Sequence, residues 1–429
     1  MSFSAARSAP HLSVVATSRN DNHGGDLLKR MQLFVSCLAE QAERHELPVE
    51  LIMVEWNPPP ERPPLRQALR WPARSDFFVA RIVTVPTEIH RSFDPQDTLP
   101  LFQMIAKNVG IRRARGKFIL ATNIDLIFPD ALMKRLRDGL EGGILYRADR
   151  HDVLRTIPDA DIGLESLLEF CRSNVIRKHD ATGTFTWQNG EWTKTGGNDF
   201  RSYWIDSLGW IFRDRLLQFA IELSARWPKS AALERLKARI HERRLPSYQL
   251  SIIAALLGWA LIGWYYQRNW RARWHQYGMQ RKFLRLHTNG CGDFTLLDRD
   301  TWFRLRGYVE WPIFSWHLDS LFLLQADANA IPFRKLPEAQ CCYHVDHGGG
   351  WTPEEQAALF ERLATKGIRV ISFEEFVRLY DEMESRGRAG REVVYNEPNW
   401  GLADIELAEE SIGSEQSPHR DGAQIAATA

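Results

Sequence analysis

Residues 117–128 read KFILATNIDLIF, and the prediction of the fold depends on this stretch. Its first half, Lys117–Thr122, is a short apolar run typical of a buried strand. The run ends in the polar triplet Asn123-Ile-Asp125, after which the sequence becomes apolar again. A strand that leads directly into an amide and a carboxylate indicates a sheet edge at which polar side chains meet a ligand.

Three further strands precede this stretch, and helical segments separate them. We predict the strands at 12–17, 51–56 and 80–85, and helices from apolar residues at helical spacing near 27–38 and 101–115. Strands that alternate with helices indicate right-handed crossovers and a mostly parallel central sheet flanked by helices, an α/β fold. Ligands of such sheets bind beyond the carboxyl ends of the strands. These ends carry Thr17–Asp21, Glu55–Asn57, Pro86–Glu88 and Asn123–Asp125.

The pattern changes along the chain divide it into four predicted regions. These are residues 1–130 with the strand–helix alternation, 131–285 as an inserted, mainly helical subdomain, 286–402 as a second ordered part, and 403–429 as a polar, disordered tail. Within the insertion, residues 185–192 predict a hairpin about the Asn189-Gly190 turn. Two charged amphipathic helices are expected near 352–366 and 373–386.

The charge of the chain is balanced overall but not locally. The whole sequence has 55 Lys and Arg against 54 Asp and Glu, whereas Arg226–Arg285 has 13 against 2. Inside that basic stretch, residues 245–267 carry no charge and are flanked by arginines. Such a segment can span a membrane, lie in its interface, enter and return, or form a buried core helix. A single span would separate Asn123–Asp125 from the histidines near 344, and a merely buried helix needs no basic flanks. We therefore favour peripheral contact through residues 245–274.

The cysteines and the amino-terminal residues bear on location. The five cysteines are scattered, odd in number and without a C-x-x-C pair, so neither a disulfide framework nor a zinc site is expected. A reducing compartment fits this pattern. The first ten residues lack the apolar core of a signal peptide. We therefore expect a cytoplasmic protein at the inner face of the membrane, with no nucleic-acid partner.

Two stretches contain residues that suit a metal ion. Alternation at a strand end would place Asn123 and Asp125 on one face, where their oxygens suit Mg²⁺ or Mn²⁺. In CYHVDHGGG, residues 342–350, His344 and His347 can each offer a neutral imidazole to a metal. The plainer alternatives are a capping role for Asp125 and a glycine-rich surface loop for the histidines.

A third stretch, Gly292–Ser320, is rich in aromatic residues and ends at His317-Leu-Asp319. Its tryptophans could stack on a sugar ring, and Asp319 could serve as a general base. The alternative is a packed aromatic cluster in which Asp319 caps the helix that starts at Ser320.

The order of these segments resembles a GT-A-fold glycosyltransferase of the nucleotide-sugar-dependent, family 2-like type. Five segments carry the resemblance: VVATSRND at 14–21, VEWNPP at 54–59, AKNVGIRRARGKFILATNID at 106–125, GDFTLLDRDTWFRLRGYVE with SWHLDS between 292 and 320, and CYHVDHG at 342–348. Together these segments contain 66 of the 429 residues.

The resemblance implies transfer of a sugar from a nucleotide-diphospho-sugar to a hydroxyl of a glycan or lipid-linked acceptor, assisted by Mn²⁺ or Mg²⁺. It implies that Asp125 binds the cation together with His344 or His347, and that Asp319 deprotonates the acceptor. The substrate-binding residues that it implies are Thr17, Arg19, Asp21, Glu55, Lys107, Asn108, Asn123, Gly292, Asp293 and Trp316.

The sequence also departs from the family pattern. Asn123 stands where the family has the first aspartate of an Asp-x-Asp triplet, and His317 and Asp319 replace two neighbouring carboxylates. The alternatives are a catalytically silent membrane-associated scaffold on the same fold, a sugar-phosphate nucleotidyltransferase, for which Ser18–Gly25 is a poor glycine-rich loop, and a polytopic membrane protein.

Overall fold

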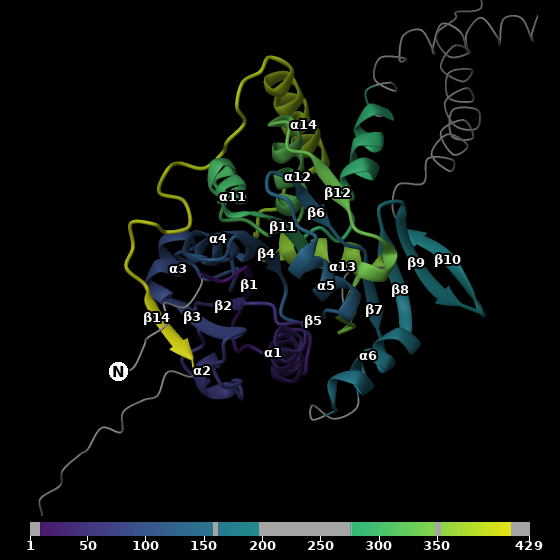
Figure 1. The fold of residues 1–429 in the computed structure, drawn as a ribbon. Coiled ribbons are helices and arrows are strands. Elements are labelled where there is room, and N and C mark those ends of the chain that lie inside the picture. The colour runs from purple at the N-terminus through teal and green to yellow at the C-terminus, as the bar shows by residue number, and fades with distance from the viewer. Residues whose placement is uncertain (1–8, 158–161, 197–274, 276, 348–352, 413–429) are drawn as a thin grey trace, which may run out of the picture. The chain divides into compact units, whose positions relative to one another are not determined.

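A computed structural model describes residues 9–157, 162–196, 275, 277–347 and 353–412 (Figure 1). The chain forms two compact units, one of Met1–Gly196 with Leu286–Ala429 and one of Gly197–Arg285. The account below concerns the first unit, which contains every residue that we predicted for the site.

The larger sheet contains the four strands predicted from the amino-terminal sequence. They are β1 Leu12–Ser18, β2 Val49–Trp56, β3 Phe78–Val85 and β4 Phe118–Thr122. β1 pairs in parallel with β2 and β4, and β2 with β3. The predicted strands are therefore confirmed, and their carboxyl ends meet at one edge of the sheet. Both β1 and β2 are buried along their whole length, as expected for central parallel strands covered on both faces.

Four later strands complete this sheet and make it mixed. They are β6 Leu145–Arg147, β11 Phe294–Asp298, β12 Phe333–Lys335 and β14 Ala408–Ile412. The strand order is β12-β6-β11-β4-β1-β2-β3-β14, with β11 antiparallel to β4 and β6, and β14 antiparallel to β3. The fold is mixed α/β, but the prediction of a mostly parallel sheet was not confirmed. That prediction rested on the first 130 residues, and antiparallel neighbours need no helical crossover.

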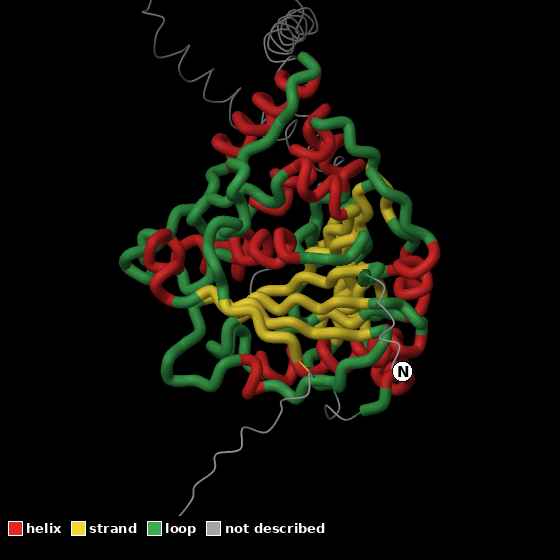
Figure 2. The backbone as a smooth tube through the Cα atoms, turned by 60° about the vertical axis from the view of Figure 1, so that its left-hand side comes forward, coloured by secondary structure: helices red, strands yellow, loops and turns green. Residues whose placement is uncertain are grey.

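Helices cover both faces of this sheet (Figure 2). α1, Leu27–Arg44, packs Met31 and Phe34 into one core with Val14 and Leu51. α4, Gln103–Arg113, lies on the opposite face, where Gly110 meets Val15 and Val54. Successive strand residues point to opposite faces of the sheet, so Val14 packs on the side of α1 and Val15 on the side of α4.

Replacing Gly110 by alanine is expected to lower the stability by about 1–3 kcal/mol, the usual cost of overpacking a core. A Cβ at residue 110 would lie 2.4 Å from Val15 Cγ1 and 3.1 Å from Val54 Cγ2, so α4 would have to move away from the sheet. Urea unfolding measures the effect. Gly142→Ala is the control, because the atom nearest to its Cβ is 3.9 Å away; equal losses in the two variants would contradict the prediction.

A smaller sheet brings distant segments together beside β4. Its strands are β5 Leu126–Ile127, β7 Arg150–Val153, β8 Val175–Asp180, β9 Gly183–Gln188, β10 Glu191–Gly196 and β13 Cys342–Val345, in the order β10-β9-β8-β7-β13-β5. In the register of this sheet, His344 pairs with Leu126 on one side and with Asp152 on the other. The β9–β10 hairpin is confirmed, with positive φ at both turn residues, Asn189 and Gly190.

The other labelled helices of the described residues lie in both halves of the chain. They are α2 Leu65–Ala68, α3 Thr87–Phe93, α5 Asp130–Asp138, α6 Leu164–Ser173, α11 Arg299–Leu305, α12 Leu318–Ala328, α13 Pro353–Thr365 and α14 Phe373–Arg388, with a 3₁₀ turn at Glu338–Gln340. α13 and α14 confirm the two predicted amphipathic helices. α12 begins two residues earlier than Ser320, so that Asp319 lies in its first turn and His317 occupies the cap position.

The boundary predicted at residue 130 differs from the one in the structure. The first unit continues through Gly196, and residues 131–196 contain five strands beside α5 and α6. This part is not mainly helical, because β6 and β7 pair with strands from the last third of the chain. Residues 197–274, including the uncharged run 245–267, lie outside the described residues. Among the described residues, no helix is long and apolar enough to cross a membrane.

The predicted disordered tail begins too early. β14 pairs with β3 along its whole length, and Figure 1 shows it as the yellow arrow beside that strand. In β14, Oε2 of Glu409 lies 2.7 Å from Nη1 of Arg81, and its Oε1 lies 3.1 Å from Nε of Arg113. An edge strand held by backbone hydrogen bonds and ion pairs needs few apolar residues. The polar composition of this segment therefore led to the prediction of disorder. Residues 413–429 lie outside the described part.

Candidate metal centre and active site

Three residues that the sequence singled out meet at the edge where the two sheets join. The ligand atoms of Asp125, His344 and His347 lie within 4.8 Å of one another. Oδ2 of Asp125 is 3.5 Å from Nε2 of His344 and 3.4 Å from Nε2 of His347. Two ligands about 2.1 Å from one ion lie about 3.0–3.4 Å apart. The spacing therefore fits a single divalent cation.

The carboxylate of Asp125 has one oxygen to spare. Oδ2 accepts a hydrogen bond of 2.6 Å from Nη1 of Arg30, a residue of α1 that is also buried. Oδ1 is buried and has no hydrogen-bond partner. A buried carboxylate oxygen without a partner is costly unless a cation or water completes it. The donor set and this unsatisfied oxygen both fit a metal ion, and Arg30 partly balances the charge of Asp125.

The protonation of the cluster follows from its charges. Burial alone would raise the pKa of Asp125, but His344, His347 and Arg30 outweigh it and hold that pKa well below its usual range. Burial lowers the pKa of His347 to about 4, so its imidazole is neutral at pH 7. Burial and Arg150 oppose protonation of His344, but Asp125 and Asp152 outweigh them and raise its pKa to about 9. A metal would thus meet one carboxylate, one neutral imidazole and one imidazole that must release a proton.

Asn123 belongs to a different set of contacts from Asp125. Its Oδ1 accepts hydrogen bonds from Lys107 Nζ at 2.9 Å and Gln103 Nε2 at 3.0 Å, and its Nδ2 donates to Asp293 Oδ1 at 2.6 Å. The strand alternation that we assumed for Asn123 and Asp125 does not hold, because β4 ends at Thr122, Asn123 follows the strand and Asp125 lies in a turn. The oxygen of Asn123 accepts from an ammonium group and an amide, so Asn123 belongs with Lys107, Gln103 and Asp293 rather than with the Asp125 cluster.

Lys107 links this edge to the segment that carries Asp319. Its ammonium group is fully buried and also donates to the carbonyl of Gly292 at 2.7 Å. Burial lowers the pKa of Lys107 to about 8, although Asp293 and Asp319 pull it upward. Asp319 lies beside this segment, since a Cβ on Gly292 would lie 3.1 Å from its Oδ2. The structure thus brings Lys107, Asn123, Gly292, Asp293 and Asp319 together.

Asn108 has a structural role. It is fully buried, and its Nδ2 donates to Tyr308 O and Glu310 Oε1 while its Oδ1 accepts from Tyr308 N. Both amide hydrogens are therefore used inside the protein, which leaves no donor for a nucleotide. Trp316 packs edge-on against Phe360 of α13, with ring centres 5.2 Å apart.

The residues predicted for the nucleotide lie at the carboxyl ends of β1 and β2. Arg19 donates to Pro100 O at 3.0 Å, and its Nε lies 3.5 Å from Asp21. Thr17 and Glu55 are buried, and each already has a backbone partner: Thr17 donates to Val54 O and Glu55 accepts from Leu65 N. Burial raises the pKa of Glu55 against the effect of that hydrogen bond. The edge that we predicted from these strands is confirmed, while contacts with a nucleotide stay a prediction.

Sequence reasoning missed three charged residues of the site: Arg30, Arg150 and Asp152. Each is at most 4% exposed. Arg150 and Asp152 form an ion pair with each other on β7, and their other printed partners, like Asp125 for Arg30, lie far away in sequence or on a neighbouring strand. Arg30 lies on the apolar side of α1 among Leu27, Met31 and Phe34, and a charge on the core side of a helix was the one available signal.

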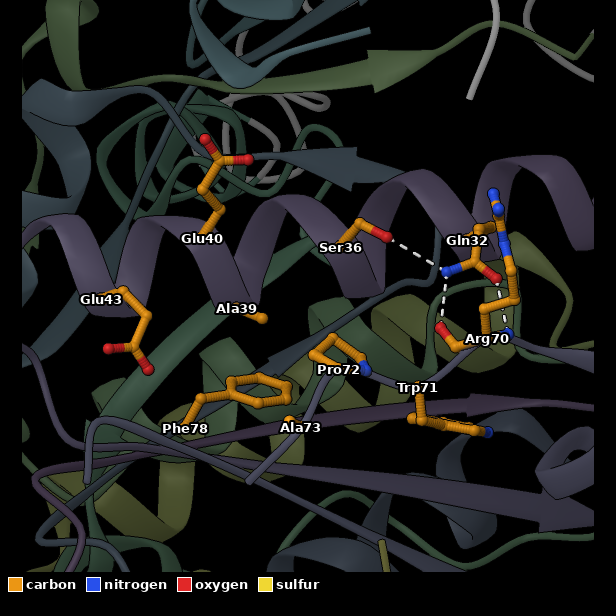
Figure 3. Close-up of a pocket in the computed structure, with 10 residues that line it drawn as sticks. All are labelled: Gln32, Ser36, Ala39, Glu40, Glu43, Arg70, Trp71, Pro72, Ala73 and Phe78. Atoms are coloured by element: carbon orange, nitrogen blue, oxygen red, sulfur yellow. Dashed lines mark hydrogen bonds between the residues drawn. The ribbon is translucent and has the colours of Figure 1, made fainter. Parts of the chain in front are cut away.

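A surface depression lies elsewhere (Figure 3). It measures about 480 Å³ and lies between α1 and residues 70–78. In Figure 3, Gln32 joins its two sides by a hydrogen bond to the backbone of Arg70, and it also donates to Ser36 of the same helix. None of the site residues lines it, so we attach no chemistry to it.

Comparison with known proteins adds no assignment: no protein-family model matches the chain, and no curated protein is significantly similar to it.

Proposed function

We propose that the protein is a divalent-metal-assisted glycosyltransferase of the GT-A-like type, which transfers a sugar from a nucleotide-diphospho-sugar to a hydroxyl of a glycan or lipid-linked acceptor. The observation that carries the proposal is the meeting of Asp125, His344 and His347, whose ligand atoms lie within 4.8 Å of one another beside the carboxyl edge of four parallel strands. Ligands of parallel sheets bind at that edge.

The residues around this cluster support a division of tasks. Asp125, His344 and His347 would hold the cation, and two imidazoles favour Mn²⁺ over Mg²⁺ because Mg²⁺ prefers oxygen ligands. The bound cation would supply the positive charge that balances the leaving diphosphate. Asp319 would accept the proton of the acceptor hydroxyl. Lys107, held by its hydrogen bonds to Asn123 and Gly292, would contribute positive charge at the same edge of the sheet.

The membrane part of the proposal rests on sequence alone. The stretch 245–274, an uncharged run followed by arginines, would hold the enzyme at the inner, cytoplasmic face of a membrane, close to a lipid-linked acceptor.

A catalytically silent scaffold is the second candidate, and the Arg30–Asp125 ion pair is the observation that favours it. The guanidinium group already places a positive charge 2.6 Å from the carboxylate. A protein that uses this pair for stability alone would bind neither metal nor nucleotide sugar.

Thermal unfolding with UDP-, GDP- and CMP-linked sugars, with and without Mn²⁺, tests the proposal. A ligand at about 100 times its dissociation constant stabilises the folded state by roughly 2.7 kcal/mol, which is a measurable rise in the midpoint. We expect one nucleotide class to stabilise the protein only when Mn²⁺ is present. No shift with any nucleotide in folded protein would overturn the proposal in favour of the scaffold.

A further inference from the structure

One buried carboxylate outside the metal cluster gathers four hydrogen-bond donors. Asp152 of β7 is 0% exposed. Its Oδ1 accepts from Arg150 Nε at 2.6 Å and from His344 Nδ1 at 3.1 Å. Its Oδ2 accepts from Arg177 Nη1 at 2.7 Å and from His179 Nε2 at 3.0 Å. Each oxygen thus accepts two hydrogen bonds, the full capacity of an ionised carboxylate.

This arrangement determines the chemistry of the two ring nitrogens of His344. An ionised carboxylate can only accept, so the hydrogen of His344 that faces Asp152 must be on Nδ1. The other nitrogen, Nε2, faces Asp125 at 3.5 Å. A neutral imidazole with its proton on Nδ1 presents the lone pair of Nε2 to that side. The register of the smaller sheet places Asp152 and His344 side by side, because the two residues pair directly between β7 and β13.

We propose that Asp152 is a positioning residue of the metal centre: it holds His344 in the one tautomer and ring orientation that directs Nε2 at the cation site. The inference rests on the proposed function for the presence of the cation. Through Arg150, which also donates to Asp293 Oδ2 at 2.8 Å, Asp152 further connects the cluster to the edge that holds Asn123.

The chain contains a matched control three residues earlier. Asp149 is also buried, and its Oδ1 lies 2.8 Å from His287 Nε2 while its Oδ2 lies 3.0 Å from Lys335 Nζ. Replacing Asp149 by asparagine removes an equivalent carboxylate–histidine contact whose histidine is not part of the Asp125 cluster.

The experiment compares Asp152→Asn and Asp149→Asn in the full chain, with Mn²⁺ alone as the ligand and calorimetric titration as the measurement. Loss of a carboxylate that orients a ligating histidine costs about 10–100-fold in metal affinity. We expect that loss for Asp152→Asn and a change below about threefold for Asp149→Asn. Equal affinity of wild type and Asp152→Asn would overturn the positioning role alone. A wild-type protein that binds no Mn²⁺ would overturn both this inference and the proposed function.

A second measurement reads the tautomer of His344 in the wild-type protein itself. The ring nitrogens of ¹⁵N-histidine-labelled, metal-free wild-type protein report which nitrogen carries the proton, and His344→Asn assigns the signal. Because the pKa of His344 is raised to about 9, the spectra are recorded above that pH, and we expect the proton of the neutral ring on Nδ1. A neutral ring protonated on Nε2 would overturn the inference.

Discussion

Asp125→Asn is expected to weaken Mn²⁺ binding by at least about 100-fold, because it removes the only carboxylate of the cluster and leaves two imidazoles that cannot balance the charge of the ion. Oδ1 of Asp125 is the buried oxygen without a partner, and Oδ2 lies between both histidines. Isothermal titration with Mn²⁺ measures the loss, and the nucleotide-dependent thermal shift should disappear with it.

The same substitution leaves Arg30 as an unpaired buried charge, which costs about 3–5 kcal/mol in comparable ion pairs. The variant could therefore lose metal binding through unfolding. Arg30→Gln combined with Asp125→Asn removes both charges and is expected to recover stability without recovering Mn²⁺ binding. Recovery of binding in the double variant would show that Asp125 is not a ligand.

Asn123→Asp, which restores the family's Asp-x-Asp triplet, is expected to destabilise the protein by about 2–4 kcal/mol at pH 7. Nδ2 of Asn123 donates to Asp293 Oδ1 at 2.6 Å, and a carboxylate at the partly buried residue 123 would place two negative oxygens at that distance. Asp293 is itself buried and held by Arg150. The amide at residue 123 is thus the complement of the carboxylate at residue 293.

The reciprocal swap tests this explanation. In Asn123→Asp with Asp293→Asn, the hydrogen bond is restored with its direction reversed, and the amide oxygen at 293 can still accept from Arg150. We expect the double variant to recover most of the stability, which corresponds to a coupling of about 2–3 kcal/mol between the two sites in a double-mutant cycle. Urea unfolding of the three variants measures it. Additive losses would contradict the explanation.

Local sequence patterns were sufficient for the elements around the site. The apolar runs that became β1 to β4, the helical spacing in α1 and α4 and the Asn189-Gly190 turn all act over a few residues, and each was predicted correctly. The absence of a disulfide framework was also readable, and all five cysteines are free and buried. Residue type alone was enough to name Asp125, His344 and His347 as metal-ligand candidates, and the structure brings their ligand atoms together.

Partners distant in the chain could not be read in the same way. The pairing of His344 with Leu126 and Asp152 joins segments separated by about 190–220 residues, and β14 returns to β3 from the end of the described chain. Asn108, predicted to contact the nucleotide, instead holds Tyr308 and Glu310. The hydrophobic periodicity of one segment does not reveal which other strand it pairs with, because pairing depends on backbone hydrogen bonds and on the burial of both strands together.

The sequence by itself determined strands β1 to β4, helices α1 and α4 and which residue types could bind a cation, since these follow from local hydrophobic patterning and side-chain chemistry. Only the tertiary structure decided that the larger sheet is mixed and that Arg30 balances the charge of Asp125. It also decided that Asn123 donates a hydrogen bond to Asp293 and that Asp152 orients His344. The physical reason is that a buried charge or amide requires a partner, and the partner is selected by the packing of the whole chain rather than by its neighbours in sequence.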